Sequence, residues 1–167
     1  MNLPMAATRL LDVVPTALPE LVGRHAFARV IGQHPGLIGR LGEHSSQTYA
    51  FAPAELPFEF FVVPRSGTVV ARRRGTPHRW AVKVSGPLVL LLALAEGRAD
   101  GDAEFFGRQI AVEGDMEAAL ALRNALENEA IDFTRDLAPG GLARGPVEAA
   151  LARLRTYLLA RGGGSWN

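Results

Sequence analysis

The stretch from Phe105 to Glu129 constrains the fold of this chain most, because a strand pattern, a turn and an amphipathic helix follow one another there. From Phe106 to Val112, alternate positions are apolar except for Arg108, and this period of two is typical of a half-buried strand. Gly114 permits a tight turn, and Asp115 is a natural N-cap for the helix that follows. The stretch therefore predicts one wall of a layered α/β domain.

The predicted helix has an alanine-rich face, which would let its axis approach a sheet closely. This face consists of Ala118, Ala119, Ala121, Leu122, Ala125 and Leu126. Met116 and Leu120 lie outside its arc, so they need a second apolar partner.

The segment from Leu88 to Ala95, LVLLLALA, is a predicted helix without any polar face. Pro87 lies near its first position, where a missing N–H costs nothing. A helix that is apolar all round must be covered on every side. One side can face the sheet, and the other needs a neighbouring element or a bound apolar ligand.

Between Thr48 and Val84 the sequence has the period of strands, with turn signals between them. The predicted strands are Thr48–Ala52, Phe58–Val63, Thr68–Arg73 and a fourth in which Trp80, Val82 and Val84 share one face. Short turns between sequential strands indicate an antiparallel meander. Together with the strand at 106–112, they predict an α/β (α+β) fold with a mainly antiparallel sheet of about five strands, covered by helices.

The chain is expected to divide into three parts: a helical segment at 1–36, a domain at 37–130, and a linker with a helix at 131–167. Pro15 and Pro19 are expected to break the first helical pattern. Whether this segment packs on the domain or presents an apolar face outward is left open. In the predicted last helix, from Pro146 to about Ala160, one apolar stripe recurs. The stripe consists of Val147, Leu151, Leu154 and Leu158.

Composition excludes several classes of function. The net charge of +1 gives no strong attraction to nucleic acid or to an anionic membrane. The absence of cysteine excludes disulfides, thiolate nucleophiles and cysteine-ligated metals. The N-terminus lacks the pattern of a secretory signal, and no apolar run reaches the roughly 20 residues of a membrane span. A cytoplasmic protein is expected.

Motifs of catalysis are missing from the sequence. There is no nucleophile elbow, phosphate loop or dinucleotide fingerprint, so no catalytic residue, cofactor or enzymatic activity is predicted. The histidines are too scattered for a metal site, and solvated or capping roles are favoured for them. They are His25, His34, His44 and His78. The run Arg72-Arg73-Arg74 is interpreted as a solvated edge strand protected against pairing, with anionic lipid headgroups and then nucleic acid as alternatives.

The order of elements from Val84 to Leu126 resembles the sterol carrier protein type-2 domain, which usually ends in a strand, Gly-Asp and a helix. Here the match is Ile110-Ala-Val-Glu-Gly114-Asp115 followed by Ala118 to Leu126, and the resemblance covers about Leu37 to Glu129. Within that family, HPGLIGRLGEH before the first strand and LPFEFFV in the second are similar to the bacterial accessory factors of ubiquinone biosynthesis.

The resemblance implies a non-enzymatic lipid carrier with an apolar tunnel between sheet and helices. The cargo would be a polyprenylated quinone precursor made without oxygen, and the partners would be enzymes and hydroxylation proteins of ubiquinone biosynthesis. Peripheral contact with the inner membrane is also implied. Two alternatives stay open: a generic lipid or fatty-acyl carrier, and an interaction module with an exposed apolar helix surface.

The residues expected to line the tunnel are apolar, and for each of them a plain core role is the competing interpretation. They are Ile38, Leu41, Phe60, Val62, Leu88, Leu91, Leu92, Phe105, Phe106, Met116, Leu120 and Leu122.

Overall fold

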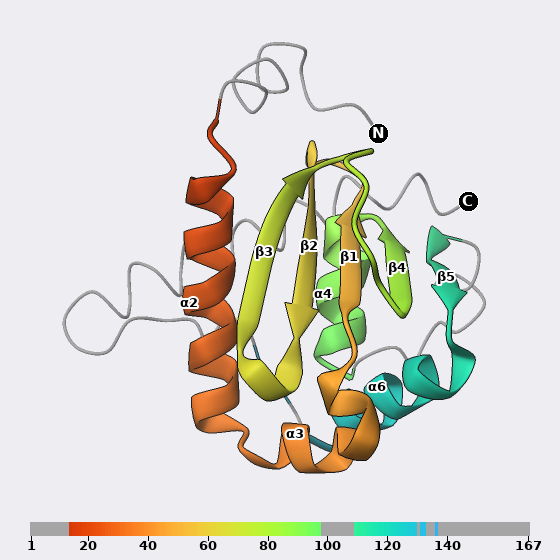
Figure 1. The fold of residues 1–167 in the computed structure, drawn as a ribbon. Coiled ribbons are helices and arrows are strands. Elements are labelled where there is room, and N and C mark those ends of the chain that lie inside the picture. The colour runs from red at the N-terminus through yellow and green to blue at the C-terminus, as the bar shows by residue number, and fades with distance from the viewer. Residues whose placement is uncertain (1–13, 98–108, 130, 133–135, 137–167) are drawn as a thin grey trace, which may run out of the picture.

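A computed structural model describes residues 14–97, 109–129, 131, 132 and 136 of the 167. In it, five strands form one sheet in the order β3-β2-β1-β4-β5 (Figure 1). The strands are β1 Tyr49–Pro53, β2 Phe58–Val63, β3 Thr68–Arg73, β4 Val82–Gly86 and β5 Ala111–Gly114. The helices are α2 Ala17–Gln33, α3 Gly36–Leu41, α4 Leu88–Ala95 and α6 Met116–Glu129, with 3₁₀ turns at Gly42–Ser46 and Pro64–Ser66. The predicted fold class is confirmed.

The fourth strand does not continue the meander, so that part of the prediction is wrong. Strands β1, β2 and β3 pair antiparallel in sequence, but β4 returns to the other side of β1 and pairs with it in parallel. The last strand, β5, then pairs antiparallel with β4. Residues 74–81 make the crossing, and Trp80 precedes β4 instead of belonging to it.

Strand β4 does not add to β3 because α2 occupies that edge of the sheet (Figure 1). Glu20 Oε2 accepts a hydrogen bond from the Ala71 N–H at 3.1 Å, and Arg24 Nε donates one to the Val69 carbonyl at 3.0 Å. The same two side chains form an ion pair of 2.9 Å. Groups that would otherwise pair with another strand are therefore bonded to a helix.

Helix α2 begins before Pro19, contrary to the expected break. A proline in the first helical turn removes only an N–H that has no partner within the helix. Val30 is buried in the core, whereas Leu18, Leu21 and Val22 are more than half exposed. The helix thus packs on the sheet and also presents apolar side chains outward.

The strand register places the helices and the crossing segment on opposite faces of the sheet. Phe51, Phe60 and Val84 are aligned across neighbouring strands and point to the face that carries the core. On the opposite face, the ring of His78 from the crossing segment lies 4.2 Å from the ring of Phe61. Phe61 is buried on that side, so β2 is covered on both faces as predicted.

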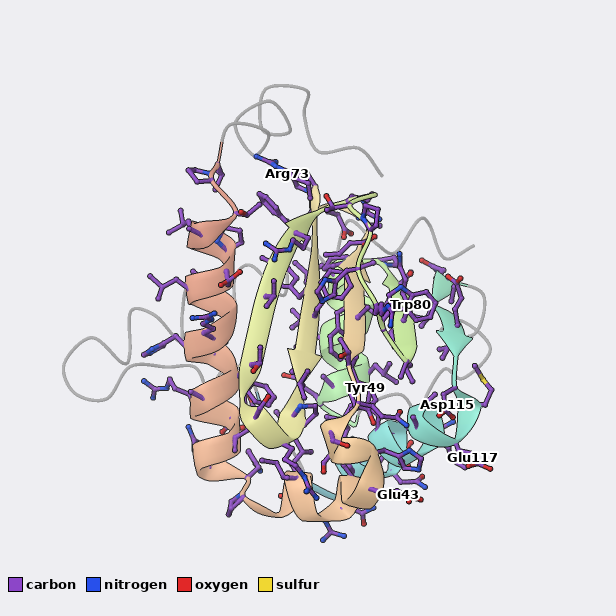
Figure 2. The ribbon with its side chains drawn as sticks, viewed as in Figure 1. Glu43, Tyr49, Arg73, Trp80, Asp115 and Glu117 are labelled. Carbon is purple, nitrogen blue, oxygen red and sulfur yellow. The ribbon has the colours of Figure 1, made fainter. Side chains whose placement is uncertain are left out.

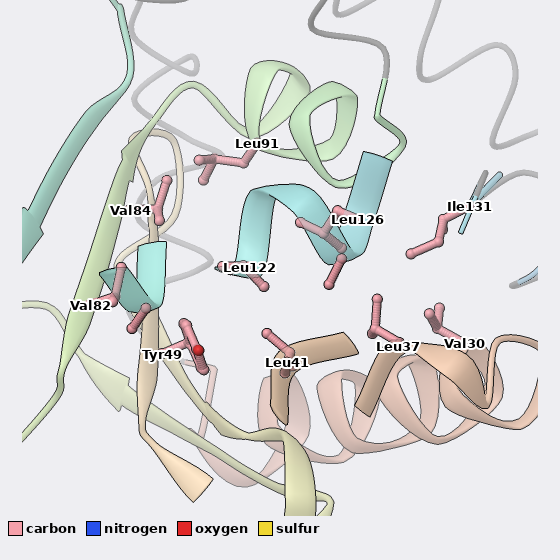
Figure 3. Close-up of a cluster of buried hydrophobic side chains, with 12 residues drawn as sticks. Val30, Leu37, Leu41, Tyr49, Val82, Val84, Leu91, Leu122, Leu126 and Ile131 are labelled. Atoms are coloured by element: carbon pink, nitrogen blue, oxygen red, sulfur yellow. The ribbon is translucent and has the colours of Figure 1, made fainter. Parts of the chain in front are cut away.

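The core lies between this first face and helices α3, α4 and α6 (Figure 3). Alanines on α6 let it approach the other elements closely, and Ala118 and Ala125 are almost fully buried. The cluster comprises Val30, Leu37, Leu41, Tyr49, Val82, Val84, Leu91, Ala118, Leu122, Ala125, Leu126 and Ile131.

The turn from β5 into α6 confirms the predicted cap. Asp115 Oδ1 accepts hydrogen bonds from the N–H groups of Ala118 at 3.1 Å and Glu117 at 2.9 Å. These bonds, that of Ala118 first, lower the pKa of Asp115, and the side chain of Gln47 adds to the effect. Gly114 has φ +101°, and a Cβ there would collide with the Ala81 carbonyl oxygen.

A cluster of buried polar side chains connects the end of α2 to the chain beyond α6 through hydrogen bonds and close polar contacts. The ring of His34 is 2.7 Å from Asp136 Oδ2 through Nε2 and 3.7 Å from Glu129 Oε2 through Nδ1. Gln33 Nε2 donates to the Asp136 carbonyl at 2.9 Å. His34 is the C-cap residue of α2, but its ring is buried and not solvated. No group of three or more His, Cys, Asp or Glu side chains within the described ranges is arranged to hold a metal ion.

Arginines from the run at the end of β3 donate hydrogen bonds to backbone carbonyls of neighbouring segments. Arg73 Nη2 donates to the Val14 carbonyl at 2.7 Å, and its guanidinium lies 4.6 Å from the centre of the Phe58 ring. Arg74 Nη2 donates to the carbonyls of Pro53 and Leu56. The expected solvated edge is not what the structure shows: β3 is an edge strand, but α2 covers its edge, and Arg73 (labelled in Figure 2) and Arg74 are hydrogen-bonded to backbone carbonyls.

Candidate functional site

The described part of the chain contains a cavity of about 430 Å³ bounded by α4, α6 and one face of β1, β4 and β5. Its volume lies within the roughly 300–1,000 Å³ typical of small-molecule sites. The lining residues are Phe51, Val84, Leu91, Leu94, Ala95, Ile110, Val112, Met116, Ala119, Leu120, Leu122, Arg123 and Leu126. Twelve of these thirteen side chains are apolar, so the cavity suits an apolar ligand.

Two features of the sequence produce this cavity. Helix α4 has no polar face, and Leu91 and Leu94 line the cavity from it. Helix α6 buries Leu122 and Leu126 but leaves Met116 and Leu120 more than half exposed at the mouth. Among the described residues no second apolar partner covers Met116 and Leu120: both line the cavity and stay more than half exposed.

The lining of the cavity has almost no groups that could take part in catalysis. It contains no hydroxyl, carboxylate, imidazole or thiol group, so it has no nucleophile and no general acid or base among the described residues. Among the described lining residues the one polar side chain is that of Arg123, whose Nε lies 2.6 Å from Glu127 Oε1. The site therefore provides an apolar contact surface and one positively charged side chain.

Four of the residues expected to line a tunnel do line this cavity: Leu91, Met116, Leu120 and Leu122. Six others, Ile38, Leu41, Phe60, Val62, Leu88 and Leu92, are not among its lining residues. Phe105 and Phe106 lie outside the described residues, as do the C-terminal helix expected from Pro146 and its apolar stripe.

The positions of four of those six residues explain why they do not line the cavity. Leu41 is in the core, with 1% of its surface exposed, and Leu92 points outward with 36% exposed. Phe60 and Val62 face the same side of the sheet as the cavity but belong to β2, nearer α2. A Cβ on Gly23 of α2 would lie 3.4 Å from the Phe60 ring.

Sequence reasoning missed the lining residues contributed by the sheet and by the last turns of α4. The signal for Phe51 and Val112 is their register with Val84, which puts all three on one face. That signal depends on knowing that β4 pairs with β1, and the assumed meander concealed it.

The sequence profile of the SCP-2 sterol transfer family matches residues 27–127, which is 101 of the 167 residues. The chain belongs to this family. The match begins inside α2 and ends inside α6, so it includes the described strands and all thirteen residues that line the cavity. No curated protein matches the chain.

Several solved structures are similar to this SCP-2 family chain at low identity. A UbiJ-SCP2 ubiquinone synthesis protein has 13% identity and a TM-score of 0.48, covering 78% of this chain and 98% of its own. Sterol carrier protein domain 2 of Helicoverpa armigera has 17% identity and a TM-score of 0.43, with coverages of 62% and 82%. Sterol carrier protein 2 from Yarrowia lipolytica, in its apo form, has 12% identity and a TM-score of 0.42, covering 71% of this chain and 97% of its own.

Proposed function

We propose that this SCP-2 family protein is a non-enzymatic carrier of polyprenylated intermediates in oxygen-independent ubiquinone biosynthesis. The observation that carries the proposal is the cavity, in which twelve of thirteen lining side chains are apolar. The resemblance of HPGLIGRLGEH and LPFEFFV to the accessory factor UbiT supports the choice of cargo. The three-part division at 1–36, 37–130 and 131–167 belongs to the same proposal.

The energy of exposing a prenyl tail to water explains why such a pathway needs a carrier. Each five-carbon isoprene unit costs roughly 4 kcal/mol to expose, at about 0.8 kcal/mol per buried carbon. A tail of several units therefore does not pass freely through water between enzymes. A cavity that shields part of the tail removes much of this cost without any catalytic group.

Delivery requires contact with other molecules. The proposed partners are the enzymes and hydroxylation proteins of ubiquinone biosynthesis, with peripheral contact to the inner membrane from the cytoplasm. None of the described helices has the length and apolar character needed to cross a bilayer.

Two observations favour alternative functions. Among the described lining residues Arg123 is the one polar group that a head group could contact, which is compatible with a generic lipid or fatty-acyl carrier. Leu18, Leu21 and Val22 form an exposed apolar surface on α2, which is compatible with an interaction module.

Extraction of the purified protein with organic solvent, followed by mass spectrometry, separates these functions. Prenylated phenols or quinones in the extract are expected from the proposed carrier. Other lipids would replace this proposal by the generic carrier, and an extract without lipid would favour the interaction module.

A pair of matched substitutions tests whether the cavity holds the extracted lipid. Leu120 and Leu21 are both exposed leucines on helices, at 57% and 65%, but only Leu120 lines the cavity. We expect Leu120→Gln to lower the amount of co-purified lipid and Leu21→Gln to leave it unchanged, with both proteins folded. Equal lipid content in the two variants would place the lipid elsewhere.

A further inference from the structure

Strand β5 forms the edge of the sheet that lies away from α2 (Figure 1). All four of its residues, Ala111–Gly114, are exposed, and none of the described strands pairs with its outer side. The opposite edge, at β3, is hydrogen-bonded to α2 through Glu20 and Arg24. The described part of the sheet therefore has one covered edge and one open edge.

The hydrogen bonds of β4 determine which backbone groups of β5 face outward. The Val82 N–H donates to the Thr48 carbonyl at 3.4 Å, so alternate residues of β4, beginning with Val82, direct their N–H and C=O groups to β1. On the other side of β4, the Asp115 N–H donates to the Ala81 carbonyl at 2.8 Å. By alternation along β5 from Asp115, the N–H and C=O groups of Val112 point away from β4.

The sequence of β5 does little to prevent pairing with another strand. Edge strands are commonly protected by Lys, Pro, a bulge or a very short length. Strand β5 reads Ala-Val-Glu-Gly, without Lys or Pro, and its register with β4 is continuous. Its short length and the single charge of Glu113 limit the affinity for a partner strand but do not block its approach.

Exposed apolar side chains lie next to this edge, on the same strand–turn–helix unit. Met116 and Leu120 of α6 are 56% and 57% exposed, Val112 is 42% exposed, and all three line the cavity. Water favours the burial of such side chains against another apolar surface. A bare peptide strand on β5 would leave Met116 and Leu120 in water, so the edge fits a partner that brings apolar side chains of its own.

We propose that the β5 edge binds the β5 edge of a second copy of this chain, in antiparallel pairing with Val112 opposite Val112 on a two-fold axis. In this register Glu113 of one copy lies opposite Ala111 of the other, so the two carboxylates do not face each other. The net charge of +1 adds little repulsion between copies.

The two-fold axis also accounts for the exposed apolar side chains. Each copy presents Val112, Met116 and Leu120, and the symmetry brings the two identical sets to one face of the joined sheet, as in a self-complementary interface. The second copy then supplies the apolar cover that Met116 and Leu120 lack among the described residues. The proposal does not depend on the identity of any lipid.

Opposite charges at Val112 test the pairing, because this residue pairs with its own copy. We expect Val112→Lys and Val112→Glu each to raise the dissociation constant of the dimer about fivefold or more, since like charges then lie opposite each other. An equimolar mixture of the two variants should recover dimers, because a lysine then faces a glutamate. Analytical ultracentrifugation of the full chain over a range of concentrations measures the association. Both variants should stay folded, since the side chain at this position reaches solvent.

Val22→Lys is the matched control. Val22 is also an exposed valine, at 62%, but it lies on α2, at the covered edge of the sheet. This variant should associate like the natural protein. An effect of Val22→Lys as large as that of Val112→Lys, without recovery in the mixture of charged variants, would overturn the proposal.

Amide hydrogen exchange gives an independent readout. Exchange at the Val112 N–H, which points away from β4, should slow as the protein concentration rises, whereas the Glu113 N–H, which faces β4, should be protected at every concentration. A protein that stays monomeric with fast exchange at Val112 would overturn the proposal and leave the carrier function standing. Protection of Val112 that does not depend on concentration would also overturn it, because the chain itself would then cover the edge.

Discussion

Gly114 is the residue at which the backbone of the β5–α6 turn has least freedom. Its φ of +101° is strained for other residues, and a Cβ would collide with the Ala81 carbonyl, which accepts a hydrogen bond from the Asp115 N–H. We expect Gly114→Ala to lower the free energy of unfolding by at least about 3 kcal/mol, from strain and a lost hydrogen bond. Urea unfolding measures the change.

Gly75 provides the control for this prediction. It also has positive φ, +82°, but a Cβ there would have no neighbour within 4 Å. Gly75→Ala should therefore cost only the backbone term of about 1–2 kcal/mol. Equal losses in the two variants would contradict the role of the close approach at Gly114.

Tyr49 should make the protein sensitive to alkali. Burial raises the pKa of Tyr49 from 10.0 to about 12, and the negative charge of Asp115 acts in the same direction. The folded state thus favours the neutral phenol, which contributes its full stability below pH 10.0 and loses that contribution as the pH rises towards about 12. Unfolding measured across this window should show stability falling with pH.

The variant Tyr49→Phe tests the assignment. It loses the hydrogen bond from the Tyr49 hydroxyl to the His44 carbonyl, 3.2 Å long, and about 1 kcal/mol of stability at neutral pH. Its stability should decline less between pH 10 and pH 12 than that of the natural protein. An unchanged decline would mean that other groups cause it.

At the scale of elements, α2 is joined to the chain after α6 by the bond between His34 and Asp136, whose side chain is fully buried. Removing one partner of a buried polar pair leaves the other without compensation, at a typical cost of about 3–5 kcal/mol. We expect a loss of that size for Asp136→Ala, measured by urea unfolding. Arg40→Ala, which breaks the more exposed pair with Glu129, should cost no more than about 1 kcal/mol.

Local patterns in the sequence predicted most elements but not their pairing. The bounds of β2, β3 and α4 were predicted as observed, because alternation, turn residues and an all-apolar run are local signals. The parallel pairing of β1 with β4 depends on α2 covering the edge of β3, which no local pattern encodes. His34 and Asp136 are separated by 102 positions, so the burial of His34 was equally hidden.

The candidate site was predicted in part for the same reason. The excess of apolar surface on α4 and α6 pointed to Leu91, Met116, Leu120 and Leu122, all of which line the cavity. Phe60 and Val62 of β2 do not line it, because strand order decides which side chains lie beneath α4.

At the scale of the whole molecule, truncation after Leu137 tests the segment beyond the described residues. If the predicted helix from Pro146 docks on the domain, truncation should lower the melting temperature, because buried leucines are lost. If the helix takes part in delivering lipid, truncation should leave the melting temperature unchanged and weaken binding to liposomes or to a pathway partner. A truncated protein unchanged in both properties would contradict both roles.

The parallel pairing of β1 with β4 leaves one side of β1 open while the ribosome is still making the chain. The paired ends of these strands, Pro53 and Gly86, are 33 positions apart (86 − 53). Synthesis at about 5–20 residues per second takes about 2–7 s to cover that distance. During this interval β2 can already pair with one side of β1, while the N–H and C=O groups on its other side have no strand to bond. Slow translation of residues 54–81 would prolong this exposure and with it the time in which β1 can pair with a wrong strand.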